Sequence, residues 1–131
     1  MCGMNAVRSP MAESLARKML PSRVFIASAG VRVGERDPFV DAVLAEDGLS
    51  PNISPPKSLE DLEDHYFELI VTLAPEAHHA ALELTRSMAV DVEYWPTADP
   101  TTVSGTRDQI MAAYRDVRER LKARIAERLA P

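Results

Sequence analysis

Cys2 and Arg8 enclose five residues near the start of the chain, and Ser9 follows directly. If those five residues curl around an anion ahead of a helix, their backbone N–H groups converge on its oxygens. Arg8 can add two parallel charge-assisted hydrogen bonds, a geometry that lysine lacks. The positive surroundings favour a Cys2 thiolate, to which Ser9 can donate a hydrogen bond, and a thiolate can attack phosphorus to form a phosphocysteine. The spacing alone equally allows an incidental thiol beside a helix cap.

Expelling an alcohol or phenol also requires a general acid, and two Asp-Pro pairs, at Asp37 and Asp99, supply candidates. A helical apolar pattern begins directly after Asp37, so Asp37 is predicted to be a helix N-cap. Asp99 follows a predicted strand, with the next helix expected only later, so no capping role is predicted for it. Loops after parallel strands gather at one edge of a sheet, where the Cys2 loop would also lie. Asp99 is therefore the predicted proton donor, with an ordinary turn as the alternative.

Apolar periodicity predicts strands that alternate with helices. The predicted strands are residues 24–29, 67–73 and 90–95. The predicted helices are residues 10–20, 37–48, 58–65, 75–87 and 106–129. This alternation predicts a single α/β domain over residues 1–131, a three-layer α/β/α fold with a short, parallel, doubly wound sheet.

Capping signals support several of these helices. Ser9 is a good N-cap, and Pro10 suits a first helical position, where its missing N–H costs nothing. Gly48 is a typical C-terminal signal for the second helix. Thr106 and Gln109 have the spacing of a capping box for the last one.

One element that a Cys2 loop requires is not found. Phosphate-binding loops of doubly wound sheets follow a strand, but only Met1 precedes Cys2, so the chain is expected to begin with a loop. We therefore expect the first, central strand to be truncated, with the natural polypeptide starting several residues upstream. A sheet without its central strand exposes unpaired edges, so low stability and little activity are expected of the shorter form.

Composition and charge limit the classes of ligand and partner that the protein is expected to bind. The net charge of -5, without a basic cluster, argues against nucleic acid, and no apolar run approaches the ~20 residues of a membrane span. One cysteine excludes an internal disulfide, and His65, His78 and His79 lack metal-ligand spacing. The expected protein is cytoplasmic and binds neither metal, nucleic acid nor membrane.

The stretch CGMNAVRSPMAESLA resembles the phosphate-binding signature of low-molecular-weight protein tyrosine phosphatases and the related thioredoxin-coupled arsenate reductases. The resemblance continues in the same order through SAG, DPFVDAVLAEDGLS, ELIVTL and the pair that begins at Asp99. It implies catalysis by Cys2 as nucleophile, Arg8 as phosphate ligand and Asp99 as general acid, without a cofactor. The phosphate-binding residues that it implies are Gly3, Met4, Asn5, Ala6, Val7, Arg8 and Ser9. The implied ligands are a phosphorylated protein or small aryl phosphate, and inorganic phosphate or another oxyanion.

Some positions depart from this family's pattern. Met4 stands where a glycine is usual, and Val7 replaces the second loop cysteine, so no resolving thiol is available for an intramolecular arsenate relay. Thr101 and Thr102 stand where tyrosines often follow the Asp-Pro pair. Trp95, the large aromatic residue nearest the loop, is either an end-of-strand residue or a platform for substrate.

Three functions remain open. The leading one is a cysteine-dependent phosphomonoesterase, most simply a protein tyrosine phosphatase. The second is an arsenate reductase that depends on an external thiol. The third is an oxyanion-binding module without turnover.

Overall fold

The computed structural model describes residues 2–4, 8–21, 24–32, 37–49, 67–86 and 90–129. Strands alternate with helices along the described chain, as the apolar pattern predicts, and the α/β fold class is confirmed. In chain order the elements are β1 (Cys2–Met4), α1 (Arg8–Met19), β2 (Gly30–Arg32), α2 (Pro38–Glu46), β3 (Leu69–Thr72), α3 (Pro75–Leu84), β4 (Asp91–Tyr94), the short 3₁₀-helix η2 (Pro100–Thr102) and α4 (Arg107–Arg128).

The described strands form two parallel pairs rather than one continuous sheet. β1 pairs with β2, with Cys2 opposite Gly30. β3 pairs with β4 from Leu69 opposite Asp91 onwards, and α3 makes the crossover between them. Parallel strands need such a crossover, which accounts for the alternating order of elements.

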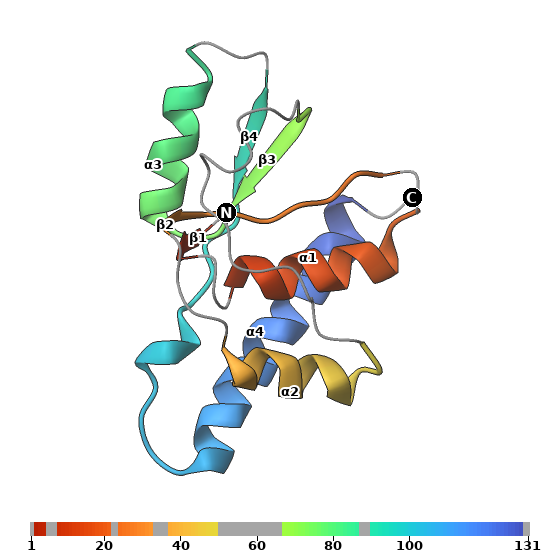
Figure 1. Ribbon diagram of the computed structural model, residues 1–131, viewed down its shortest axis with the longest axis vertical. Coiled ribbons are helices and arrows are strands. Elements are labelled where there is room, and N and C mark those ends of the chain that lie inside the picture. Colours follow the sequence, from red (N-terminus) through yellow and green to blue (C-terminus); the bar gives the residue numbers. More distant parts are fainter. Residues whose placement is uncertain are drawn as a thin grey trace.

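Helices lie on two sides of the strands (Figure 1). α3 runs along one side and contacts all four strands. α1, α2 and α4 form a separate helical layer, in which α4 packs against both α1 and α2. The ends of β3 and β4 contribute Leu73 and Trp95 to the core of this layer.

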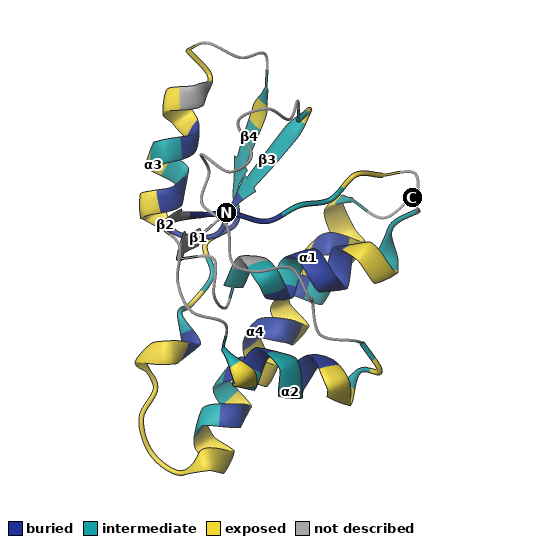
Figure 2. Ribbon diagram, in the orientation of Figure 1, coloured by how far each residue is buried: buried dark blue, intermediate teal, exposed yellow. Residues whose placement is uncertain are grey.

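The main core lies inside the helical layer, where the buried faces of the helices meet (Figure 2). Its buried residues are Met11, Leu15, Ala16, Val40, Val43, Leu44, Leu73, Trp95, Met111, Tyr114, Val117, Leu121 and Ile125. In α4 these residues recur every three or four positions, so the apolar repeat predicted for this helix is confirmed. None of the helices in the described ranges has the length and apolar character of a membrane span.

The first predicted strand is wrong in position. Residues 24–29 form no strand, and the observed strand is β2, which begins at Gly30. Because Cys2 stands opposite Gly30 in a parallel register, the positions opposite residues 24–29 would precede Cys2. The loop predicted at the start of the chain is also wrong, since Cys2–Met4 is extended and forms β1.

Other predicted boundaries shift by a few residues or hold. The later strands are confirmed in shorter form as β3 and β4, and the helix predicted at residues 58–65 lies outside the described residues. α1 begins at Arg8, so the predicted N-cap Ser9 is already helical. Gly48 adopts φ +73°, the left-handed conformation typical of a helix end, and the Thr106–Gln109 capping box is formed.

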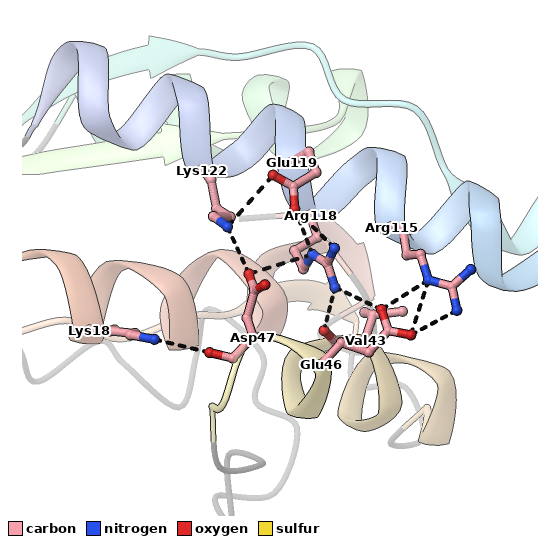
Figure 3. Close-up of polar contacts among 8 residues, drawn as sticks. All are labelled: Lys18, Val43, Glu46, Asp47, Arg115, Arg118, Glu119 and Lys122. Atoms are coloured by element: carbon pink, nitrogen blue, oxygen red, sulfur yellow. Dashed lines mark hydrogen bonds and ion pairs between the residues drawn. The ribbon is translucent and has the colours of Figure 1, made fainter.

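A polar network joins α2 to α4 beside this core (Figure 3). Arg118 Nη1 donates to the carbonyl oxygen of Val43 at 2.7 Å and to Glu46 Oε1 at 2.9 Å. Arg115 holds the same carboxylate through Nη2, 2.7 Å from Glu46 Oε2. Two arginines of one helix therefore converge on a single carboxylate at the end of another.

Candidate active site

Arg8 is the first residue of α1, and its side chain is anchored far along the chain. Arg8 Nη1 donates a 3.0 Å hydrogen bond to the carbonyl oxygen of Thr97, 89 residues later. The side chain is only 15% exposed, so this bond is largely shielded from water. A guanidinium carries five N–H donors, and the bond to Thr97 uses one of them.

Thr97 is itself fixed by the sheet. The pairing of β3 with β4 continues past the strand ends, where Thr97 N donates to the carbonyl oxygen of Leu73 at 3.0 Å. The Thr97 hydroxyl donates to the carbonyl oxygen of Trp95 at 2.8 Å. The acceptor that positions Arg8 is therefore an extension of the sheet, not a free loop.

Asp99 lies in the same segment and faces Arg8. Its Oδ2 is 3.8 Å from Arg8 Nη2, and its side chain is 38% exposed. The other oxygen, Oδ1, accepts hydrogen bonds from Thr101 N at 3.0 Å and Thr101 Oγ1 at 2.6 Å. The two oxygens of Asp99 thus have different partners.

These bonds correct one prediction. Asp99 does have a capping role, because it is the N-cap of η2, with Pro100 at the first helical position. The turn holds only three residues, too few for apolar periodicity to reveal it. Asp37, the other Asp-Pro aspartate, is the N-cap of α2 as predicted, with Oδ1 2.9 Å from Phe39 N.

A hydrogen bond joins α4 to the beginning of α2. Tyr114, buried on α4, donates from its hydroxyl to Asp37 Oδ2 at 2.6 Å. Burial raises the pKa of Tyr114, and the bond to Asp37 and the negative charges of Asp37 and Asp99 raise it further. Tyr114 thus anchors the Asp37 N-cap to the core of the helical layer.

The predicted site residues are only partly brought together. Arg8 and Asp99 meet, although they lie far apart in the sequence. The backbone of Cys2, Gly3 and Met4 forms β1. The remaining predicted phosphate ligands lie outside the described residues or inside a helix: Asn5, Ala6 and Val7 are outside, and Ser9 is in α1.

Trp95 belongs to the core. Its side chain is 4% exposed, and its indole N–H donates to Glu93 Oε1 at 3.2 Å. The guanidinium of Arg124 lies 5.5 Å from the ring centroid. Burial and these partners favour the end-of-strand interpretation over a platform for substrate.

His78, on α3, contacts residues of β3 and β4. His78 Nδ1 is 3.0 Å from the hydroxyl of Thr72, and the imidazole stacks on Tyr94 with centroids 4.7 Å apart. Within the described ranges, no three His, Cys, Asp or Glu side chains are grouped so that they could hold a metal ion.

Sequence reasoning missed two residues that hold the side chains of Arg8 and Asp99. Thr97 acts through its carbonyl oxygen, which no side-chain pattern can reveal. Thr101 could have been found, because Asp99 followed by Pro100 is the same N-cap signal that identifies Asp37. An N-cap side chain accepts a hydrogen bond from an N–H group two or three residues later, and Thr101 is two residues later.

The chain is similar to known proteins over nearly its whole length. Residues 1–130 match the family described as low molecular weight phosphotyrosine protein phosphatase. An arsenate reductase from Bacillus licheniformis is 27% identical over 125 residues, which cover 95% of this chain and 88% of that protein.

Two solved structures share the fold over nearly the whole chain. The tyrosine phosphatase amsI from Erwinia amylovora is 26% identical with a TM-score of 0.74, covering 99% of this chain and 90% of that one. An arsenate reductase from Archaeoglobus fulgidus is 30% identical with a TM-score of 0.64, covering 95% of each chain. The chain belongs to the low molecular weight phosphotyrosine protein phosphatase family.

Proposed function

We propose that this protein is a cysteine-dependent phosphomonoesterase that acts on phosphotyrosine or a similar aryl phosphate through a phosphocysteine. The observation that supports it best is the 3.8 Å approach of Arg8 Nη2 to Asp99 Oδ2. A cation that can bind phosphate and a carboxyl group that can move a proton are thereby set side by side. Membership of the phosphatase family supports the same reaction class.

The first step transfers the phosphoryl group to the enzyme. The Cys2 thiolate attacks phosphorus, an S–P bond forms and the bond from phosphorus to the ester oxygen breaks. Asp99 gives its proton to the departing oxygen, so a neutral phenol or alcohol leaves. Arg8 binds the phosphoryl oxygens with the N–H groups that the Thr97 carbonyl leaves available.

The second step returns the thiolate. Asp99, now a carboxylate, accepts a proton from a water molecule whose oxygen attacks phosphorus. The S–P bond breaks, Cys2 leaves as thiolate and inorganic phosphate is released. No electron is gained or lost, and Asp99 ends the cycle protonated, as it began.

The test is hydrolysis of p-nitrophenyl phosphate by the wild type and three variants. Cys2→Ser should abolish hydrolysis, and Asp99→Asn should lower kcat by roughly 10²–10⁴-fold, the usual contribution of a general acid or base. Asp37→Asn is the matched control, because it makes the same change in the other Asp-Pro cap, and its activity should stay within about twofold of the wild type. Full activity of Cys2→Ser would disprove the proposal.

A second candidate is an arsenate reductase that uses an external thiol, favoured by the similarity to the arsenate reductases above. The Cys2 thiolate would displace an oxygen of arsenate to form an As–S bond. An external thiol would then attack the Cys2 sulfur, so that an S–S bond forms, the As–S electron pair stays on arsenic and arsenite leaves. A second external thiol would free Cys2 by disulfide exchange.

Arsenite formation with glutathione present separates the two candidates. The reductase requires arsenite production that Cys2→Ser abolishes, at a rate exceeding ester hydrolysis. Hydrolysis without arsenite formation would exclude the reductase and support the phosphatase. Phosphate binding without either activity would favour an oxyanion-binding module.

A further inference from the structure

We infer that Thr101 is a positioning residue, whose hydroxyl fixes the Asp99 carboxyl group so that the catalytic proton sits on Oδ2. This inference rests on the proposed role of Asp99 as general acid. It concerns a residue that touches neither Cys2 nor phosphate in the proposed mechanism and acts through Asp99.

Thr101 occupies one oxygen of Asp99 completely. Its backbone N–H and its hydroxyl both donate to Oδ1, at 3.0 Å and 2.6 Å. A carboxylate oxygen has two lone pairs, so two donors fill both of them. A proton could bind Oδ1 only by displacing one of these donors.

The other oxygen faces the site. Oδ2 lies on the side of Arg8, whose Nη2 is 3.8 Å away, farther than a direct hydrogen bond. Arg8 therefore does not take up the lone pairs of Oδ2, which can accept a proton. A neutral Asp99 holds its proton on this oxygen, on the side where Arg8 would bind the phosphoryl group.

Burial does not hold Asp99 in this orientation, because its side chain is 38% exposed. An exposed carboxyl group rotates unless specific bonds restrain it. The Thr101 hydroxyl lies 2.6 Å from Oδ1, at the short end of the range for O–H···O bonds, and it donates to this oxygen whether or not Oδ2 carries a proton. Thr101 is thus the side chain that keeps Oδ2, and with it the proton, on the side of Arg8.

A leaving-group comparison tests this role. Phenolate is a poor leaving group that needs the proton, whereas 2,4-dinitrophenolate leaves readily as an anion. Thr101→Val keeps the branched shape and the backbone N–H but removes the hydroxyl. It should lower kcat/KM for phenyl phosphate about tenfold, part of the 10²–10⁴-fold that a general acid contributes, and change it less than about twofold for 2,4-dinitrophenyl phosphate.

Two variants serve as controls. Thr101→Ser keeps a hydroxyl and should restore the phenyl phosphate activity. Thr102→Val makes the same change one residue later, where the hydroxyl donates to the Asp99 carbonyl oxygen at 2.9 Å and not to the carboxylate. Its activity should match the wild type on both esters.

The outcomes distinguish the inference from the proposed function. If Thr101→Val lowers kcat/KM equally for both esters, or for neither, Thr101 does not position the acid. If Asp99→Asn shows a leaving-group-dependent loss and Thr101→Val does not, the inference alone fails. If the wild type hydrolyses neither ester, or Asp99→Asn shows no such loss, the proposed function fails and the inference fails with it.

Discussion

Arg118 Nη1 lies 2.7 Å from the carbonyl oxygen of Val43, and this bond crosses from α4 to the last turn of α2. The final carbonyl groups of a helix have no partner within the helix. The N–H of Asp47, at the C-cap, bonds to the carbonyl oxygens of Leu44 and Ala45, and Arg118 donates to the carbonyl oxygen of Val43. A charged side chain thereby completes a helix end inside the α2–α4 contact.

Replacing Arg118 should destabilise the fold. The side-chain exposure of Arg118 is 10%, so Arg118→Met would remove a largely buried donor to the Val43 carbonyl oxygen and leave Glu46 with one cation fewer. We expect a loss of about 2–3 kcal/mol in the free energy of unfolding, measured by urea denaturation. Arg120→Met on the same helix is the control, because the Arg120–Asp116 pair is mostly exposed, and it should cost less than about 0.5 kcal/mol. Equal losses would contradict a special role for Arg118.

Glu46 should make the stability of the fold depend on pH in the acid range. Its pKa is lowered from 4.5 to about 2, mainly by the hydrogen bond with Arg115; burial opposes this change, and the hydrogen bond with Arg118 and the charges of both arginines lower the pKa further. The folded state therefore binds this proton more weakly than the unfolded state. The stabilisation is complete above about pH 4.5 and is lost as the pH falls through about 2.

Urea midpoints at pH 7, 5, 4 and 3 test this dependence. Glu46→Gln should lower the midpoint at pH 7 and flatten its decline toward pH 3. The control is Glu127→Gln, at an exposed position on α4, which should follow the wild-type curve. Parallel curves for Glu46→Gln and the wild type would show that the arginine contacts carry no net stabilisation.

Tyr114 should make stability fall at alkaline pH. Its pKa is raised above 10, mainly by burial and then by the bond to Asp37. Because the folded state holds this proton more tightly, the stabilisation is present below about pH 10 and is lost as the pH rises above it. Tyr114→Phe should cost about 1 kcal/mol at pH 7 and remove this alkaline decline. Tyrosinate absorbance at 295 nm should show the ionisation of Tyr114 together with unfolding and not before it.

Oxidation should inactivate the protein irreversibly if Cys2 is the nucleophile. Cys2 is the sole cysteine of this chain, so a sulfenic acid on it meets no resolving thiol within these residues and proceeds to sulfinic acid. After prolonged peroxide treatment, we expect that dithiothreitol does not restore activity. Mass spectrometry should then show two oxygens added to the Cys2 peptide. Inorganic phosphate, as a competing ligand, should slow the loss. Full recovery would contradict the prediction.

Local signals in the sequence predicted local structure well. The Asp37 N-cap and the Thr106–Gln109 box depend on residues a few positions apart, and both are formed. The strand expected at residues 24–29 failed because a strand requires a partner in register, which an apolar run does not specify.

The charged side chains of the candidate site could be predicted from the sequence, but the backbone atoms that hold charged side chains in place could not. Arg8 and Asp99 follow from residue type and from the rule that loops gather at one edge of a parallel sheet. The Thr97 carbonyl and the Arg118–Val43 bond depend on backbone atoms, which every residue has, so no residue type marks them in a sequence.

The docking of α4 on both α1 and α2 sets an order of events during synthesis. A ribosome releases α1 and α2 long before α4, yet their buried residues share one core with Leu121 and Ile125 of α4. Until α4 leaves the exit tunnel, Met11 and Leu15 lack part of the core in which they are buried. We expect ribosome-arrested chains that stop before α4 to be cut readily by protease, and chains released beyond it to resist. Resistance in the shorter arrests would mean that the first helices fold without α4.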